Sequence, residues 1–394
     1  MPPVSIARCP DYTRVEEVLE SCLEPLGGMG RYVSPGQKVL LKPNLLAAAE
    51  PETAITTHPS VVRAVARLVK RAGGRPIVAD SPGVDVPSTE GGLRRLYRTS
   101  GLLALAEAGE YELSYDATPV SVANPDGKVV KRLDLFRPAV EADVVIALPK
   151  LKTHALTKIT GATKILFGTV LGMGKPGYHA AFHDPSLFGE LLLDIIEAVR
   201  PALFIMDGVL GMEGDGPGRH GTPRTFGLLL ASPDAVALDL AVCRLIGLDP
   251  ARVPPLRAAR DRGLWNGHVQ PTLVGGETLD DFMIPDFRLP RGDRDELADA
   301  RSMLPVPDPF RNALRQVVVD LFAATPEPIR DRCTGCGSCV KACPVGAMRI
   351  EGRLAVVDRQ ACIRCYCCHE MCPQAAIDLR VSRLGRAISR VAGR

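Results

Sequence analysis

The sequence predicts a mostly parallel, doubly wound α/β sheet followed by a small α+β domain that is rich in cysteine. A length of 394 residues is long for one domain. Short apolar runs alternate with longer helical patterns through the first three quarters of the chain, and nine of the twelve cysteines fall between Cys333 and Cys372. We therefore expect an α/β domain at residues 1–325, a small domain at 326–380 and a tail at 381–394.

Composition excludes several classes of protein. Hydrophobic residues make up 46% of the chain and charged residues 24%, which is ordinary for a globular protein. A net charge of +3 lacks the one-sided excess of a dedicated nucleic-acid binder. The first residues show no basic segment followed by an apolar run, and no apolar stretch of about 18 residues occurs. The sequence thus predicts a cytoplasmic protein with no nucleic-acid partner and no integral membrane segment.

Four apolar runs, several rich in β-branched residues, predict buried strands at residues 38–42, 76–80, 144–148 and 203–207. Helical patterns lie between them at residues 60–72, 92–108 and 187–200. Strands that alternate with helices favour a parallel sheet covered on both faces. Residues 284–309 predict a surface connection, and residues 324–331, which include two prolines, predict a linker into the last domain.

Polar segments follow the predicted strands. They are residues 42–44 (Lys-Pro-Asn), 80–83 (Asp-Ser-Pro-Gly), 149–154 (Pro-Lys-Leu-Lys-Thr-His) and 207–208 (Asp-Gly). Ligands of open α/β sheets bind beyond the carboxyl ends of the strands. We therefore expect these four segments to meet at one edge of the sheet.

Lysine is concentrated in one part of a chain that otherwise prefers arginine. Five of the eleven lysines lie between Lys150 and Lys175, and no Asp or Glu occurs from Val144 to His183. A lysine supplies a compact ammonium group that can titrate, whereas an arginine supplies a planar guanidinium group. Apolar residues interleave with these lysines, which favours an anion pocket over the alternative of a solvated basic face.

Candidate roles follow from this pocket. We expect the catalytic residues to be Lys152 and Lys164, which would polarise an anion, and His154, a proton donor that titrates near neutral pH. We expect the anion to be bound by Lys42, Asn44, Lys150, Thr153 and Lys175.

The cysteines of the last domain form two runs with one spacing. The first is Cys-x2-Cys-x2-Cys-x3-Cys-Pro from Cys333 to Pro344, and the second repeats it from Cys362 to Pro373. In proteins with this spacing the fourth cysteine of each run binds the other cluster. The runs predict two 4Fe-4S clusters, one held by Cys333, Cys336, Cys339 and Cys372, and the other by Cys362, Cys365, Cys368 and Cys343.

Alternatives remain for parts of this region. Paired cysteines also bind zinc, although zinc requires neither the third cysteine of each run nor the proline. Cys367 has no place in the pattern, which favours a spectator over a ligand. Residues 381–394 form a basic amphipathic stretch that would dock a partner or an anionic membrane, or pack on its own protein, which is the commoner arrangement.

Two resemblances extend these inferences. Residues 330–380 resemble the two-cluster bacterial ferredoxins, which implies low-potential electron transfer with a redox partner protein. Residues 4–290 resemble the domain-of-unknown-function 362 family, through motifs that include Lys-Leu-Lys-Thr-His at residues 150–154 and Gly-Met-Glu-Gly at 211–214. Several members of that family carry a ferredoxin unit at the carboxyl end, so the resemblance implies this architecture without supplying a substrate.

The leading hypothesis for function is an iron-sulfur oxidoreductase that moves electrons between two clusters and an anionic substrate or cofactor in the lysine- and histidine-lined site. An alternative is a non-catalytic electron carrier whose α/β domain docks a partner enzyme. A third is a redox sensor whose tail refolds on cluster loss. A closed, ligand-sized pocket at the lysine segment would favour the first hypothesis over the second.

Overall fold

A computed structural model describes residues 2–81, 83, 86–171, 174–265, 270–291 and 323–382. The expected surface connection at 284–309 lies outside the described residues from 292 onward. The expected basic tail likewise lies outside them from residue 383.

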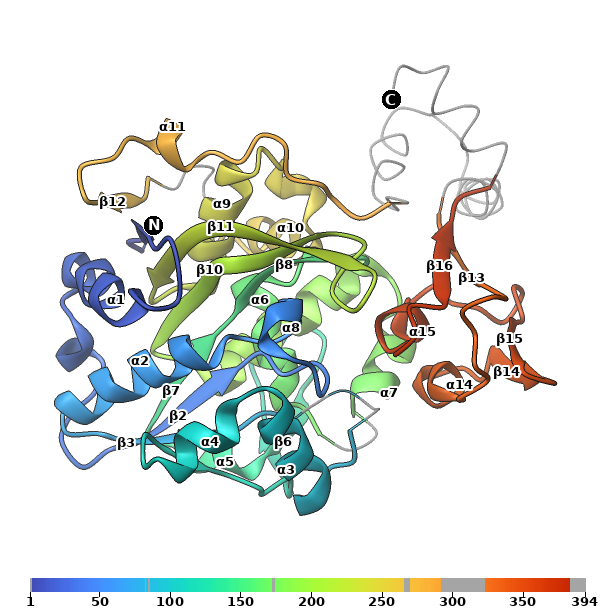
Figure 1. Cartoon of the computed structure of the whole chain (residues 1–394), viewed down its shortest axis with the longest axis horizontal. Coiled ribbons are helices and arrows are strands. Elements are labelled where there is room, and N and C mark those ends of the chain that lie inside the picture. The colour runs from blue at the N-terminus through green and yellow to red at the C-terminus, as the bar shows by residue number, and fades with distance from the viewer. Residues whose placement is uncertain are drawn as a thin grey trace.

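One large sheet forms the centre of the first domain (Figure 1). Its main path runs β12 (Thr272–Val274), β1 (Ser5–Arg8), β11 (Gly221–Ser232), β10 (Leu203–Gly214), β7 (Val144–Leu148), β2 (Lys38–Pro43), β3 (Arg75–Val78) and β4 (Glu112–Leu113). Strands β10, β7, β2, β3 and β4 are mutually parallel, and β11 is antiparallel to both neighbours. The prediction of a mostly parallel sheet is therefore confirmed.

Helices cover both faces of this sheet. Successive residues of a strand point to opposite faces; accordingly Leu203 and Ile205 of β10 join one buried apolar cluster, and Phe204 and Met206 join another. The first cluster includes α1 (Val15–Leu23), α2 (Pro59–Arg71), α3 (Glu90–Thr99) and α4 (Leu102–Glu107). The second includes α6 (Gly161–Ile165), α8 (Pro185–Val199), α9 (Ala235–Leu245) and α10 (Pro254–Asp261). The doubly wound arrangement is thus confirmed.

Smaller elements complete the first domain. A two-stranded sheet consists of β5 (Pro119–Ala123) and β6 (Arg132–Phe136), and β9 (Lys158–Ile159) pairs with β8 (Lys150–His154). The short helices are α5 (Arg137–Glu141), α7 (Gly174–Ala181) and α11 (Leu279–Phe282).

Three segments differ from the prediction. The helix expected at 92–108 is two helices, because Gly101 adopts φ +75° between α3 and α4 and interrupts the helical path. The strand expected at 203–207 continues to Gly214, where pairing with β11 extends it as a hairpin. The segment 149–154, expected as a loop, forms β8, which pairs with β10 through Asp207 and Met212.

The C-terminal unit, residues 323–382, is a small α+β structure. Strand β13 (Thr325–Pro328) pairs with β16 (Ile377–Arg380), and β14 (Met348–Glu351) pairs with β15 (Leu354–Val357). The two helices are α14 (Ser338–Ala342) and α15 (Cys367–Glu370). The expected linker at 324–331 therefore contains the first strand of this unit. Figure 1 shows the unit at one side of the first domain, with α15 turned toward it.

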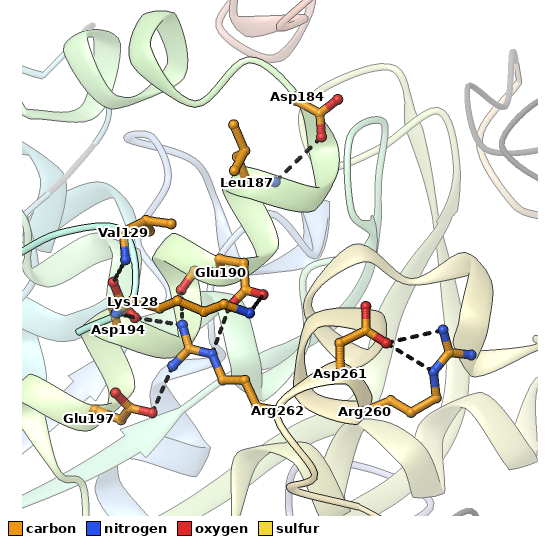
Figure 2. A network of polar contacts seen from close by, with 10 residues as sticks. All are labelled: Lys128, Val129, Asp184, Leu187, Glu190, Asp194, Glu197, Arg260, Asp261 and Arg262. Atoms are coloured by element: carbon orange, nitrogen blue, oxygen red, sulfur yellow. Dashed lines mark hydrogen bonds and ion pairs between the residues drawn. The ribbon is translucent and has the colours of Figure 1, made fainter. Parts of the chain in front are cut away.

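A buried ion network ties α8 to the turn between β5 and β6 (Figure 2). The fully buried Asp194 carboxylate accepts the backbone N–H groups of Lys128, Val129 and Val130 at 2.7–2.9 Å. Arg262 donates to Asp194, Glu190 and Glu197. Because Arg262 is about nine-tenths buried, these carboxylates are needed to offset the free-energy cost of removing its charge from water.

Replacing Asp194 by alanine should destabilise the first domain by about 3–5 kcal/mol, since Arg262 would be left buried without its closest partner. Glu197→Gln is the matched control, because the Glu197 side chain is 39% exposed and its ion pair should contribute less than about 1 kcal/mol. Thermal unfolding of both variants measures the difference. Equal losses of stability in the two variants would show that burial does not determine how much each ion pair contributes.

Candidate functional site

A pocket opens at the carboxyl edge of the sheet, where the direction of strand order changes between β2 and β7. Open α/β sheets bind ligands at such a switch point. The empty space between its walls, including the mouth, is about 760 Å³. The first domain contributes Lys42, Asn44, Leu45, Leu46, Asp80, Ser81, Gly83, Lys152, Thr160, Lys164, Ile165, Phe167, Gly168, Lys175, His179 and Pro217, and the C-terminal unit contributes Ala342, Cys367, Glu370 and Met371.

Three of the four lysines in the pocket have fixed partners. Lys42 Nζ lies 2.7 Å from Asp80 Oδ1, and both side chains are buried. Lys152 Nζ donates to Asn44 Oδ1 at 2.9 Å and to the Ile55 carbonyl at 2.6 Å. Lys175 Nζ donates to the carbonyl and hydroxyl of Ser81. The polar residues expected after β2 and β3 therefore orient lysines that come from other elements.

Lys164 is held in place by the start of α6. The Asp239 carboxylate accepts the N–H groups of Ala162 and Thr163 at 2.6 and 2.9 Å. Gly161, at φ +60°, is required there, since a Cβ would lie about 2.4 Å from Asp239 Oδ2. Lys164 Nζ lies 5.6 Å from the centre of the Phe167 ring and has neither a hydrogen bond nor an ion pair within the described part of the chain. Among the described residues, it is the unpaired cation of the pocket.

Three buried polar atoms of the pocket-lining residues have no hydrogen-bond partner among the described residues: Thr160 Oγ1, His179 Nδ1 and Glu370 Oε1. The first two belong to the first domain, where the Thr160 and His179 side chains are only 3% and 6% exposed. The His179 ring stacks on Phe188, with centroids 4.8 Å apart, and burial lowers its pKa to about 3. His179 is therefore neutral at ordinary pH and presents one donor and one acceptor nitrogen.

Removal from water lowers the pKa of every pocket lysine. Burial acts first on Lys42, Lys152, Lys164 and Lys175. The pKa of Lys175 falls to about 7, while that of Lys152 falls well below its usual value, with the charge of Lys164 adding to the effect. A bound anion would restore the charged forms, because an opposite charge nearby favours an ammonium group. The pocket is thus electrostatically suited to an anion.

Five of the eight expected α/β site residues line the pocket: Lys42, Asn44, Lys152, Lys164 and Lys175. Lys150 does not, because its fully buried amine pairs with Asp207 at 2.7 Å and donates to the Tyr12 hydroxyl. Thr153 is also outside, with its hydroxyl accepting the N–H of Gly216. On strand β8, alternation separates Lys152 from Thr153 by face.

His154 is not among the residues that line the pocket. Its Nδ1 accepts the backbone N–H groups of Leu156 and Thr157, so a proton on the neutral ring must be on Nε2. Nε2 lies 3.1 Å from Glu370 Oε1, and burial lowers the pKa of His154 well below its usual value. Among the described residues, Glu370 is the pocket-lining residue whose side chain lies next to His154.

Sequence reasoning missed the contribution of α15. Cys367, expected to be a spectator, lines the pocket with Glu370 and Met371. No motif in the first domain pointed to these residues, and the cysteine spacing pointed only to their neighbours. Thr160 and His179 were not assigned either, although both lie in the acid-free lysine segment.

Each predicted set of four cluster ligands lines one cavity of the C-terminal unit. Cys333, Cys336, Cys339 and Cys372 surround the first cavity, and Cys343, Cys362, Cys365 and Cys368 surround the second. Three of these sulfurs accept backbone N–H groups: Cys333 from Ala355, Cys343 from Ala347 and Cys372 from Ala376, at 3.1–3.3 Å. Such bonds tune thiolates that ligate iron-sulfur clusters. These residues therefore fit the expected cofactor.

The two cysteine runs share one backbone path. Gly335, Gly337 and Gly346 have positive φ in the first run, and Arg364, Tyr366 and Ala375 have it at the equivalent positions of the second. Side chains other than glycine rarely adopt this conformation. Its retention in the second run indicates that each loop must wrap its cavity in the same way.

The C-terminal unit is fixed to the first domain beside the pocket. His369 Nε2 lies 3.2 Å from the Asp215 carbonyl oxygen. Arg291 pairs with Asp215 at 2.6 Å and with Asp378 at 2.9 Å, which joins the β10–β11 hairpin to β16. Leu46 also packs against the apolar cluster that contains Cys367 and Met371. These contacts explain how α15 becomes a wall of the pocket.

Comparison with known proteins identifies both parts. A model of the family described as a domain of unknown function (DUF362) matches residues 39–244, and a 4Fe-4S binding domain model matches residues 326–349. A thylakoid-associated protein from Synechocystis is 40% identical over 284 residues, which cover 69% of this chain and 86% of that protein. One component of an ion-translocating oxidoreductase complex from Methanosarcina acetivorans is 48% identical over 48 residues, which cover 12% of this chain and 18% of that component.

Similarity to solved structures is weaker. The apoprotein of lactate racemase from Thermoanaerobacterium thermosaccharolyticum matches with a TM-score of 0.34 and 12% identity, covering 61% of this chain and 56% of that one. In the described part of the chain, no helix combines the length and apolar character needed to cross a membrane. By the family match and the Synechocystis relative, the chain belongs to the DUF362 family and carries a 4Fe-4S ferredoxin domain at its carboxyl end.

Proposed function

We propose that this protein is an iron-sulfur oxidoreductase that exchanges low-potential electrons with an anionic small molecule bound in the lysine-lined pocket. One observation carries the proposal. The pocket that contains Lys152 and Lys164 is also lined by Cys367, Glu370 and Met371. Cys367 directly precedes the expected cluster ligand Cys368, and Met371 directly precedes the expected ligand Cys372. The anion site and the electron-transfer unit therefore share a wall.

The proposal includes two 4Fe-4S clusters, which when bound supply one-electron transfer. Two cavities with four cysteines each support it, as does the equal backbone path of the two runs. Cys336 of the first set is exposed, whereas Cys365 of the second set is buried in the apolar cluster that also contains Cys367 and Met371 of the pocket wall. We propose that a redox partner protein meets the exposed side and that the buried side faces the pocket.

The residues of the first domain would bind and orient the anion. Lys164 supplies the unpaired positive charge, while Lys42, Lys152 and Lys175, held by their partners, set the potential around it. Lys152 and Lys164 are our candidates for polarising the substrate. His154 and Lys150 do not line the pocket; we assign them the positioning of Glu370 and of strand β8 respectively.

The alternative, an electron carrier whose first domain only docks a partner, finds less support. A docking surface would present the lysines on an exposed face, but Lys42 and Lys152 are buried in the wall of a pocket. We also propose a cytoplasmic location. This part of the proposal rests on the sequence, and the thylakoid association is a property of the Synechocystis relative.

Protein reconstituted without oxygen should contain about eight iron atoms and eight acid-labile sulfides per chain, since each cubane holds four of each. Replacing Cys336 and Cys339 together by serine should lower the iron to about four, because one cluster loses two ligands. Cys367→Ser is the control and should keep all the iron. Iron and sulfide assays test this, and stoichiometric zinc in the wild type would contradict it.

Protein purified without oxygen should release an organic anion on denaturation, to be identified by mass spectrometry. Lys164→Met should release little of it, because the unpaired cation is lost, while Lys131→Met, an exposed lysine outside the pocket, should match the wild type. The identified compound should reoxidise the reduced clusters of the wild type and not of Lys164→Met, which should retain its iron. A compound bound equally by both proteins would count against the pocket.

Anion affinity should depend on pH through Lys175. Its pKa of about 7 reflects removal from water first, then attraction by Asp80 and repulsion by Lys42 and Lys164. A bound anion raises the pKa of Lys175. The affinity for benzoate, whose own charge does not change between pH 7 and 9, should therefore rise by at most about tenfold per pH unit as the pH falls from 9 to 7. Below pH 7 the affinity should level off. Isothermal titration should find that benzoate affinity depends less on pH in Lys175→Met than in the wild type. An unchanged dependence on pH would show that a group other than Lys175 takes up the proton.

A further inference from the structure

Three groups of the first domain that line the pocket have unused hydrogen-bonding capacity. Thr160 Oγ1 and His179 Nδ1 are buried without a partner among the described residues. Lys164, in the pocket with them, has no ion pair or hydrogen bond there. An unsatisfied buried polar group costs roughly 1–3 kcal/mol, so three in one pocket indicate a ligand that satisfies them.

These groups border the same part of the pocket. Thr160 immediately precedes α6 in helical conformation, and Lys164 follows four positions later, so both lie on one face of that turn. Lys164 Nζ lies 5.6 Å from the centre of the Phe167 ring. The His179 ring packs edge-on against that same ring, with centroids 5.3 Å apart. Phe167 thus links Lys164 to His179, and the turn of α6 links Lys164 to Thr160.

The remaining pocket lysines already donate to other residues, so they offer a ligand fewer free N–H groups than Lys164 does. Lys42 is neutralised by Asp80, and Lys152 and Lys175 donate to neutral oxygens of other residues. Glu370 also lines the pocket and attracts Lys164. One unpaired ammonium beside a carboxyl group fits a singly charged carboxylate better than a doubly charged phosphate.

The remaining residues of the pocket wall indicate the chemical character of the rest of the ligand. Leu45, Leu46, Ile165 and Phe167 line it, and Met371 adds a thioether. Apolar walls with a few placed polar groups are typical of small-molecule sites. The body that fits here is a hydrocarbon or a ring.

On this basis we propose that Thr160, Lys164 and His179 form the subsite for the carboxylate of an organic acid with an apolar body. The inference rests on the proposed function and adds the ligand class and two binding residues. The ammonium and hydroxyl groups donate to the carboxylate, and the neutral imidazole donates one N–H. With the carboxylate held on α6, the apolar body extends along the wall that includes Met371.

Isothermal titration of the cluster-loaded protein with benzoate, cinnamate and hexanoate, each against its neutral amide, tests the subsite. The wild type should bind at least one acid about tenfold or more tightly than its amide. Thr160→Val should weaken that binding by about three- to tenfold and Lys164→Met by more than about tenfold, as loss of neutral and charged hydrogen bonds predicts. Binding of the amide should change little.

Thr56→Val is the matched control. Thr56 Oγ1 is likewise buried and unpartnered among the described residues, but Thr56 does not line the pocket, so affinity should be unchanged. The Tm of Thr160→Val without ligand should not fall, because a binding hydroxyl with no protein partner contributes nothing to the empty fold; a structural role would lower it.

Two results would overturn the proposal. One is equal affinity of the wild type and Thr160→Val for the acids. The other is no preference for any acid over its amide. In either case reoxidation of the clusters by the co-purified compound decides separately whether the proposed function stands.

Discussion

The structure depends on holding several lysine amines out of water at one edge of a parallel sheet. Desolvation disfavours the charged form of each, and the fold offsets this through Asp80 for Lys42 and through Asn44 and the Ile55 carbonyl for Lys152. Those partners come from the segments after β2 and β3, which explains why these loops are polar. The arrangement leaves Lys164 without a fixed partner among the described residues, so the charge that the protein does not neutralise is concentrated at one point, beside the unit that carries the cysteines.

Helix α15 connects that point to the cysteine loops. Within Cys367–Glu370 the chain supplies one expected cluster ligand and two pocket residues, and Cys372 follows directly after Met371. His154 and Asp215 restrain α15 from the side of the first domain, through Glu370 and His369. Helix α15 thus joins the pocket to the cysteine loops, and the ion pairs of Arg291 with Asp215 and Asp378 add a second connection between the two parts, although they match different family models.

Much of this was predictable, and the parts that were not have physical reasons. Strand and helix periodicity gives the sheet, and the cysteine spacing gives the two sets of four thiols. Lys42 and Asn44, which were chosen for their position at the end of a strand, line the pocket, because the edge of a parallel sheet is a local consequence of chain direction. The same argument predicted that Lys150 lies in the pocket. In the structure Lys150 instead forms a buried ion pair with Asp207, because the segment after β7 that was expected to be a loop forms strand β8. The contribution of Glu370 depends on how the two parts pack, which no local pattern contains.

The short helix α6 shows how stability and binding are balanced at this site. Its five residues would not hold a helix alone. Asp239 fixes its first turn, and the approach of that carboxylate requires glycine at position 161. Burial raises the pKa of Asp239 to about 6, so its charge is maintained against desolvation by the N–H groups of Ala162 and Thr163 and the Thr163 hydroxyl. This turn requires a buried carboxylate and a glycine, and it leaves the Thr160 hydroxyl without a partner in the described part of the chain, so it lowers local stability. Such a cost is expected where the geometry of a side chain, here Lys164, matters to a ligand.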